Sequence, residues 1–243
     1  MRSQDALAHL RVVTGAFLRD VGEASTGESD PTAVCADIRW SVTELVAHLG
    51  AVHRWAAANS REAKRHPRTN VPKLDVSLTE WYSTSRDEML NTFDELDPLA
   101  KAYTLSKTDK TVAFWHRRQL FETLVHLWDL RSAADPAAHP PAEVNAEVYA
   151  DGVSELFDLF VPRSGTLAPL GGGVELIATD TGDRWTFGND WQRDGGHELT
   201  ATVSAPADEL LLWAWNRGRA RDAVSREGDL AVIERFERAH VRP

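Results

Sequence analysis

The stretch that organises this chain is residues 111–131, TVAFWHRRQLFETLVHLWDLR. Its apolar residues fall largely on one broad face at helical spacing, which predicts an amphipathic helix. Glu122 and His126 are four residues apart, so their side chains lie one above the other on that helix. Asp129 follows His126 by three residues and points to roughly the same side. A charge buried among apolar neighbours is costly without a partner or a metal ion. The side chains of Glu122, His126 and Asp129 are therefore expected to have such a partner or to bind a metal ion.

A second stretch, residues 40–55, has the sequence WSVTELVAHLGAVHRW and also predicts a helix. Ser41 or Thr43 is suited to cap its start, and Glu44 lies three residues after Ser41, as a capping box requires. His48 stands among apolar residues of this helix. His53 lies five residues further on, and at about 100° per residue its ring diverges from that of His48 by roughly 140°. His53 is therefore a poor partner for His48 at one metal ion.

His48, Glu122 and His126 together offer three nitrogen and oxygen ligands. Three protein ligands are what a catalytic zinc site uses while it keeps one position open. Histidine and carboxylate ligands without cysteine favour zinc but also suit other divalent transition ions. The alternative is an ordinary contact between residues four apart on an amphipathic helix, and the spacing of Glu122 and His126 alone does not decide between the two.

The two stretches resemble the signature helices of the mycothiol-dependent maleylpyruvate isomerase family, which belongs to the DinB-type four-helix metalloproteins. Residues 40–48 match the first motif, a Trp-Ser/Thr-Val start that leads to a histidine. The second motif is an arginine followed by Glu-x-x-x-His and then an aspartate. It is matched here by Arg118, Glu122, His126 and Asp129. Residues 174–187 and 209–230 look like the second domain of that family, so the resemblance covers most of the chain.

The resemblance implies a metal-dependent enzyme, with zinc favoured, that uses mycothiol as its thiol co-substrate. The thiolate would add to an activated double bond and leave again in an isomerase, or stay on an electrophile in an S-transferase. Asp129 is expected to orient a histidine ligand. Arg217 is expected to act on the substrate, and an arginine suits a carboxylate. Alternatively, Arg217 belongs to a basic cluster with Arg219 and Arg221 at the C-terminus of a helix.

The composition limits the classes of partner. With 42% apolar and 26% charged residues, the chain has the composition of a globular protein. The net charge of −10 argues against a nucleic-acid partner, which needs basic side chains against its phosphates. The N-terminus does not read as a signal peptide, and no apolar run reaches the length of a membrane span. The single Cys35 excludes an intramolecular disulfide and suits the cytoplasm. We expect a monomer or small homo-oligomer with a small-molecule substrate.

The order of elements predicts a DinB-like four-helix bundle followed by a small α+β domain. Four helices are expected at 4–20, 41–59, 78–97 and 111–131, with loops at 22–31 and 61–73 and a further helix at 143–162. Residues 163–173, RSGTLAPLGGG, read as a linker, and beyond it the hydrophobic period changes to that of strands. The expected domains are therefore residues 1–165, which bind the metal, and residues 170–243.

Two other classes of function remain open at this point. A metal hydrolase would activate water in the same open position, and its activity would not require an added thiol. A non-catalytic metal-binding protein would accept no thiol, and Arg217 would then be dispensable. The sequence does not name the substrate.

Overall fold

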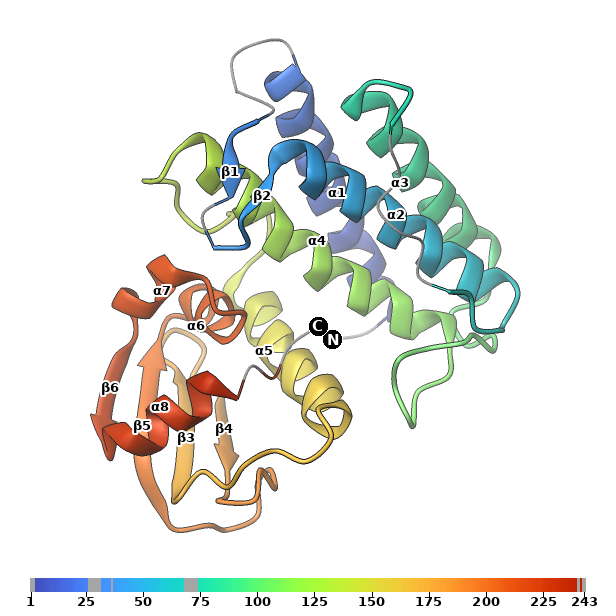
Figure 1. Ribbon diagram of the computed structural model, residues 1–243. Helices are drawn as coiled ribbons and strands as arrows, with labels where there is room; N and C mark the ends of the chain where they lie inside the picture. The colour runs from blue at the N-terminus through green and yellow to red at the C-terminus, as the bar shows by residue number, and fades with distance from the viewer. Residues whose placement is uncertain (1–2, 26–31, 36, 68–73, 240, 242–243) are drawn as a thin grey trace. The chain divides into compact units, whose positions relative to one another are not determined.

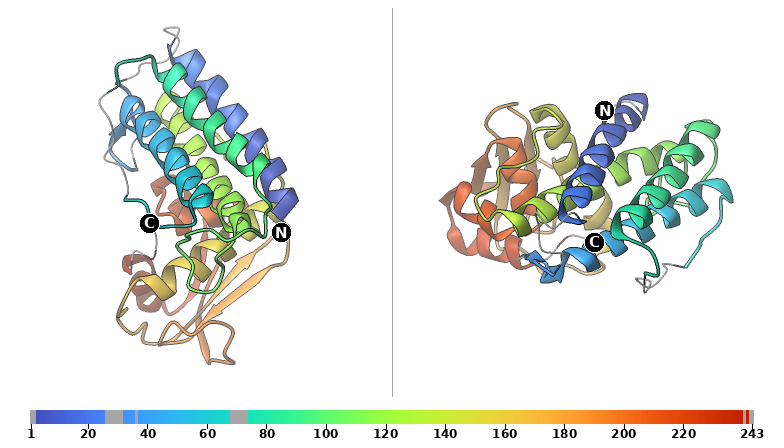
Figure 2. Two further views of the ribbon diagram at one scale, coloured as in Figure 1. Left: turned by 90° about the vertical axis from the view of Figure 1, so that its right-hand side faces the viewer. Right: turned by 90° about the horizontal axis from the view of Figure 1, so that it is seen from above.

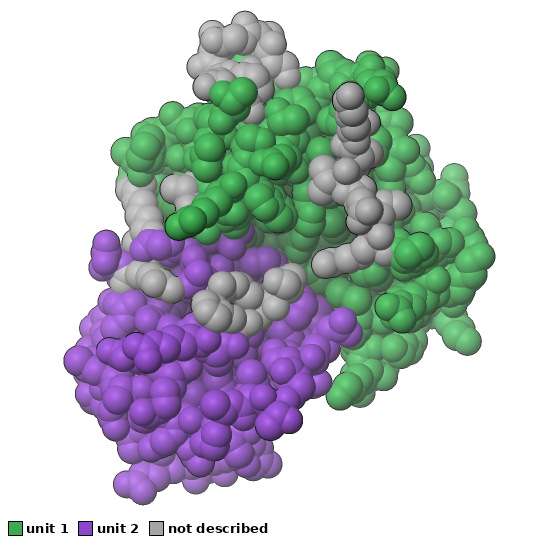
Figure 3. Space-filling model, in the orientation of Figure 1, with its two compact units in different colours: residues 1–143 green, residues 144–243 purple. Residues whose placement is uncertain are grey.

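The computed structural model describes residues 3–25, 32–35, 37–67, 74–239 and 241. The chain divides into two compact units, residues 1–143 and residues 144–243 (Figure 3). Residues 26–31 and 68–73, which belong to the two loops expected in the first unit, lie outside the described residues.

The first unit is a bundle of four helices, as predicted (Figures 1 and 2). They are α1 (Ser3–Ser25), α2 (Val42–Arg61), α3 (Leu78–Glu95) and α4 (Val112–Ala134). Helix α1 packs against α3 and α4, and α2 packs against the same two helices, so the four surround one core. Helix α1 continues to Ser25, into the part of the chain that was expected to be a loop.

Helix α4 is buried on more sides than its sequence predicts. Every side chain from Arg118 to Leu130 is buried, including those on the face that was expected to be polar. The helix contacts α1 and α2 in the bundle, and strand β1 (Val34–Cys35) also packs against it. Its charged residues therefore have to find partners within the protein, because buried charges are not hydrated.

The start of α2 is fixed by the predicted capping box. The Ser41 hydroxyl accepts a hydrogen bond from the Glu44 backbone N–H at 3.2 Å, and the Glu44 carboxylate accepts one from the Ser41 backbone N–H at 2.8 Å. A short hairpin precedes the helix, in which β1 pairs with β2 (Trp40–Ser41), so that Cys35 lies opposite Trp40. The sequence analysis did not foresee this hairpin, because strands of two residues carry no period.

Two side chains lock α2 to its neighbours. Trp81 of α3 lies against Gly50 and donates its indole N–H to the Ala47 carbonyl at 3.3 Å; a Cβ at Gly50 would collide with the Trp81 ring. His53 is fully buried between α3 and α4. Its Nδ1 donates to the Gln119 side-chain oxygen at 2.8 Å, and its Nε2 lies 3.3 Å from the Tyr82 hydroxyl.

The second unit contains a four-stranded sheet in the order β4-β3-β5-β6. Strands β3 and β5 are parallel, and β4 and β6 run antiparallel to them at the two edges. The elements are β3 (Gly173–Ala178), β4 (Arg184–Phe187), β5 (Leu199–Ala205), β6 (Ser225–Gly228), α5 (Ala146–Phe160), the 3-10 turn η1 (Val161–Arg163), α6 (Ala207–Ala214), α7 (Gly218–Ala223) and α8 (Leu230–Arg238). The predicted α+β class is thus confirmed, whereas α7 and β6 were not foreseen.

Helix α5 belongs to this second unit, although the sequence analysis placed it with the bundle. The Trp185 indole of β4 donates to the Ser154 hydroxyl of α5 at 2.8 Å. Phe157 of α5 also packs on Phe187 of β4 and Phe236 of α8. An apolar helix face does not reveal which core it covers, and the sequence therefore did not show that α5 belongs to the second unit. The compact units divide about 20 residues before the expected linker.

None of the described helices combines the length and the apolar composition that a membrane crossing requires.

We expect the buried His53 to make the stability of the fold depend on pH. Burial lowers the pKa of His53 to about 4, from an ordinary value of 6.5, and the bond to Gln119 only partly opposes this. The unfolded chain then binds a proton that the folded chain refuses, so stability falls as the pH drops from 6.5 to 4, by on the order of 3 kcal/mol. Urea unfolding at several pH values should show this fall, and His53→Gln should make it shallower.

The matched control is His139→Gln, which removes an exposed histidine and should leave the pH dependence as it is. A His53→Gln protein with the pH dependence of the wild type would contradict the assignment of this fall to His53.

Candidate metal centre

The structure brings three potential metal ligands from two helices of the bundle together. Glu122 and His126 lie one turn apart on α4, and His48 faces them from α2. The Glu122 Oε1 atom lies 3.6 Å from His48 Nε2 and 3.6 Å from His126 Nε2. One potential ligand atom from each of the three residues lies within 4.8 Å of the other two. His53 is not part of this group, because both of its ring nitrogens face other partners.

The chemistry of the three donors fits a divalent ion. Donors at about 2.1 Å from a tetrahedral ion lie roughly 3.4 Å from each other, close to the two separations measured from Glu122 Oε1. Two imidazoles and one carboxylate are a ligand set that zinc and other divalent transition ions accept. Glu122 and His126 are buried, whereas His48 is partly exposed and leaves one side of the group accessible.

Glu122 is held in its charged form by a buried arginine. Arg118 lies one turn before it on α4 and pairs through Nη2 with Glu122 Oε2. Burial alone would raise the pKa of Glu122, but the charge of Arg118 and the contacts with His126 and His48 hold that pKa well below its ordinary value. A carboxylate that stays ionised is the form a metal ligand requires.

His126 is oriented by Asp129. The His126 Nδ1 atom donates to Asp129 Oδ2 at 2.9 Å, and this contact leaves Nε2 to face Glu122. Burial lowers the pKa of His126, but the contacts with Asp129 and Glu122 outweigh it and raise that pKa overall. A carboxylate on the far nitrogen of a histidine ligand fixes its tautomer and makes it more basic. The hydrogen bond that an orienting role requires is present, and the role of Asp129 itself stays a prediction.

Trp40 adds an aromatic wall that the sequence analysis did not assign. Its ring lies 4.7 Å from the His48 ring and 6.2 Å from the His126 ring, measured between centroids. The pairing of Trp40 with Cys35 and the capping box at the next residue fix its place. The only signal in the sequence was the position of Trp40 at the start of the first motif.

Arg217, the remaining candidate residue, lies in the second unit. It is buried, precedes α7 as its N-cap, and donates from Nη1 to the Trp215 carbonyl at 2.9 Å. It therefore stands between two helices rather than in the last turn of one. Asn216 before it has a φ of 63°, a left-handed conformation that glycine adopts freely and asparagine tolerates. The expected role of Arg217 in catalysis stays a prediction.

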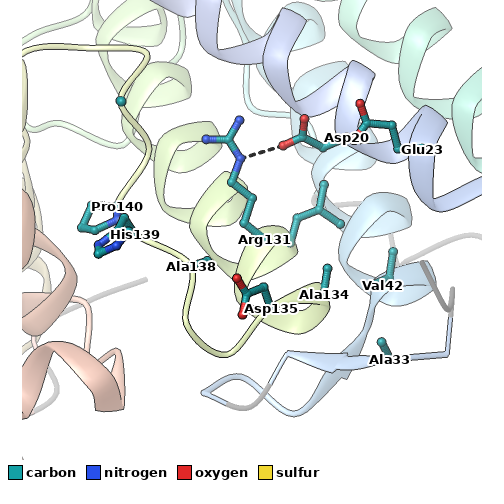
Figure 4. A pocket seen from close by; sticks show the side chains of 12 residues that line it. Asp20, Glu23, Ala33, Val42, Arg131, Ala134, Asp135, Ala138, His139 and Pro140 are labelled. Atoms are coloured by element: carbon teal, nitrogen blue, oxygen red, sulfur yellow. Dashed lines mark hydrogen bonds and ion pairs between the residues drawn. The ribbon is translucent and has the colours of Figure 1, made fainter. Parts of the chain in front are cut away.

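A separate cavity of about 480 Å³ opens in the first unit, at the C-terminal end of α4 (Figure 4). Charged side chains and small apolar ones share its wall. Arg131 donates there to Asp20 at 2.7 Å, and it also binds Glu143 through both of its terminal nitrogens. None of the three candidate metal ligands lines this cavity, so it does not replace the metal centre as the candidate site.

The comparisons with known proteins agree with these two units. Residues 7–131 match the family model described as the mycothiol maleylpyruvate isomerase N-terminal domain, and residues 147–235 match the model of the C-terminal domain of the same family. Crystal structures of the mycothiol-dependent maleylpyruvate isomerase and of a histidine-to-alanine mutant of it are similar in fold, each with a TM-score of 0.63 at 13% identity over 94% of this chain and 95% of the other. No curated protein matches the chain significantly.

We expect His126→Ala to abolish stoichiometric metal binding, because it removes one of three donors and the nitrogen that Asp129 orients. The measurement is metal content by mass spectrometry after dialysis against zinc. His139→Ala is the control, since it removes a histidine outside the metal centre. A His126→Ala protein that retains one equivalent of zinc would rule out the assignment.

Proposed function

The chain belongs to the mycothiol-dependent maleylpyruvate isomerase family, and from this premise we propose that His48, Glu122 and His126 hold one divalent metal ion, with zinc favoured. Membership of the family makes the chain an enzyme that uses mycothiol. We propose further that it acts on a small electrophilic substrate, either as an isomerase or as a mycothiol S-transferase. The observation that carries the metal site is the convergence of three donor atoms on one point.

The residues around this point have complementary tasks in the proposed reaction. A divalent ion bound there would favour the thiolate of mycothiol over the thiol, and the thiolate is the nucleophilic form. Arg118 keeps Glu122 ionised, and Asp129 keeps the His126 ring in one orientation. Trp40 lies beside the two imidazole rings and is proposed to shield one side of them from water. Cys35 is buried, so the nucleophile is proposed to come from the co-substrate and not from the chain.

In the isomerase form of the proposal, the thiolate sulfur adds to an activated carbon–carbon double bond. The double bond becomes a single bond, its electron pair passes to the conjugated carbonyl group, and the adduct rotates. The electron pair then returns, the carbon–sulfur bond breaks and the thiolate leaves, so that no atom is gained or lost. In the transferase form the carbon–sulfur bond remains, and the enolate formed by the addition takes up a proton from water at the carbon next to the carbonyl group.

Thiol dependence tests this proposal directly. Purified protein loaded with zinc should convert maleylpyruvate or another activated electrophile only when mycothiol is added, because the single cysteine of the chain, Cys35, is buried. Product formation should be followed with mycothiol, with glutathione and without thiol, and again after removal of zinc with a chelator. Equal turnover without any thiol would instead support a hydrolase that activates water.

We also expect Arg217 to bind a carboxylate of the substrate. Arg217→Ala should keep its metal content while turnover falls by about 10²- to 10³-fold, the usual effect of removing one electrostatic donor. Arg184→Ala is the control, since this exposed arginine of the same unit pairs with Glu175 on the sheet. If Arg217→Ala melts at the wild-type temperature and keeps its turnover, the residue has no catalytic role.

A further inference from the structure

The two oxygens of the Glu122 carboxylate face different partners. Oε1 points to the two imidazole nitrogens, at 3.6 Å from each. Oε2 pairs with Arg118 Nη2 on the opposite side. Both side chains are almost completely buried, with 3% and 6% of their surface exposed, so water screens the attraction between them only weakly.

A carboxylate in a metal site is able to bind through one oxygen or through both. Binding through both would use a second coordination position, and in a site with three protein ligands that position is the one left open for a reacting group. An arginine on one oxygen opposes this, because its planar guanidinium fixes the direction of the carboxylate, which a lysine ammonium does less well. Its positive charge also cancels the charge that Glu122 brings to the site.

We propose that Arg118 is a positioning residue that restricts Glu122 to binding the metal ion through Oε1 alone, and so keeps a coordination position for the thiol. This inference rests on the proposed function, since it presupposes the metal site. An arginine that only neutralised a buried carboxylate would serve the fold equally well from any direction. Here Arg118 pairs with Glu122 Oε2, the oxygen through which the carboxylate would otherwise bind the ion a second time.

The test uses cobalt(II) in place of zinc, because cobalt(II) absorbs visible light more strongly with four ligands than with five or six. In Arg118→Met the second oxygen of Glu122 becomes available, so the visible absorption of the cobalt protein should fall clearly below that of the wild type. Mycothiol, followed through its thiolate-to-cobalt absorption at pH 7, should bind roughly tenfold more weakly, because the second oxygen of Glu122 then competes for the open coordination position.

Arg117→Met is the matched control, since Arg117 is the neighbouring residue on α4 and lies over the Phe121 ring instead. It should leave the cobalt spectrum and the mycothiol affinity as in the wild type. Arg118→Lys keeps the charge without the planar group, so its cobalt spectrum and its mycothiol affinity should both lie between those of the wild type and those of Arg118→Met. This variant also carries the test if Arg118→Met does not fold.

A spectrum and a mycothiol affinity in Arg118→Met equal to those of the wild type would overturn the inference and leave the proposed function standing. Loss of cobalt from this variant would also overturn it, because Glu122 should gain an oxygen at the ion and not lose one. A wild-type protein that binds no cobalt and no zinc would refute the metal site itself, and the inference with it.

Discussion

A helix that is buried on nearly every side has to compensate each of its charges internally, and α4 is under this constraint. Between Arg118 and Asp129 it carries an arginine, a glutamate, a histidine and an aspartate, and all four are buried. They compensate one another in two pairs along the helix, Arg118 with Glu122 and His126 with Asp129. These pairs decide which atoms of Glu122 and His126 turn towards α2.

Buried neutral polar groups of the bundle also find hydrogen-bond partners within the protein. Thr123 donates its hydroxyl to the Gln119 carbonyl one turn earlier, and the Gln119 side chain accepts from His53. Burial lowers the pKa of His53, whereas the contacts of His126 with Asp129 and Glu122 outweigh burial and raise the pKa of His126. The partners on each ring thus shift the pKa values of these two buried histidines in opposite directions.

The sequence analysis predicted most of the fold from hydrophobic spacing, since four long helices and three strands repeat their apolar residues at distinct periods. The same spacing placed Glu122 and His126 on one helix face. His48 was added as the third ligand because it stands among apolar residues of a second predicted helix, and not because of its spacing. The prediction failed where periodicity is absent or ambiguous. The β1–β2 hairpin is too short to show a period, and the apolar face of α5 fits either core. The direction of the Arg118 side chain depends on packing that no spacing encodes.

The donors of the candidate site are divided unequally between helices, with Glu122 and His126 on α4 and His48 alone on α2. A helix detached from its bundle would offer an ion only two of the three. An ion bound by all three would therefore bind the assembled bundle in preference to the unfolded chain, and the melting temperature would rise with the free metal concentration. The availability of metal in the cell would in this way regulate how much folded enzyme persists, and not only how much of it is active.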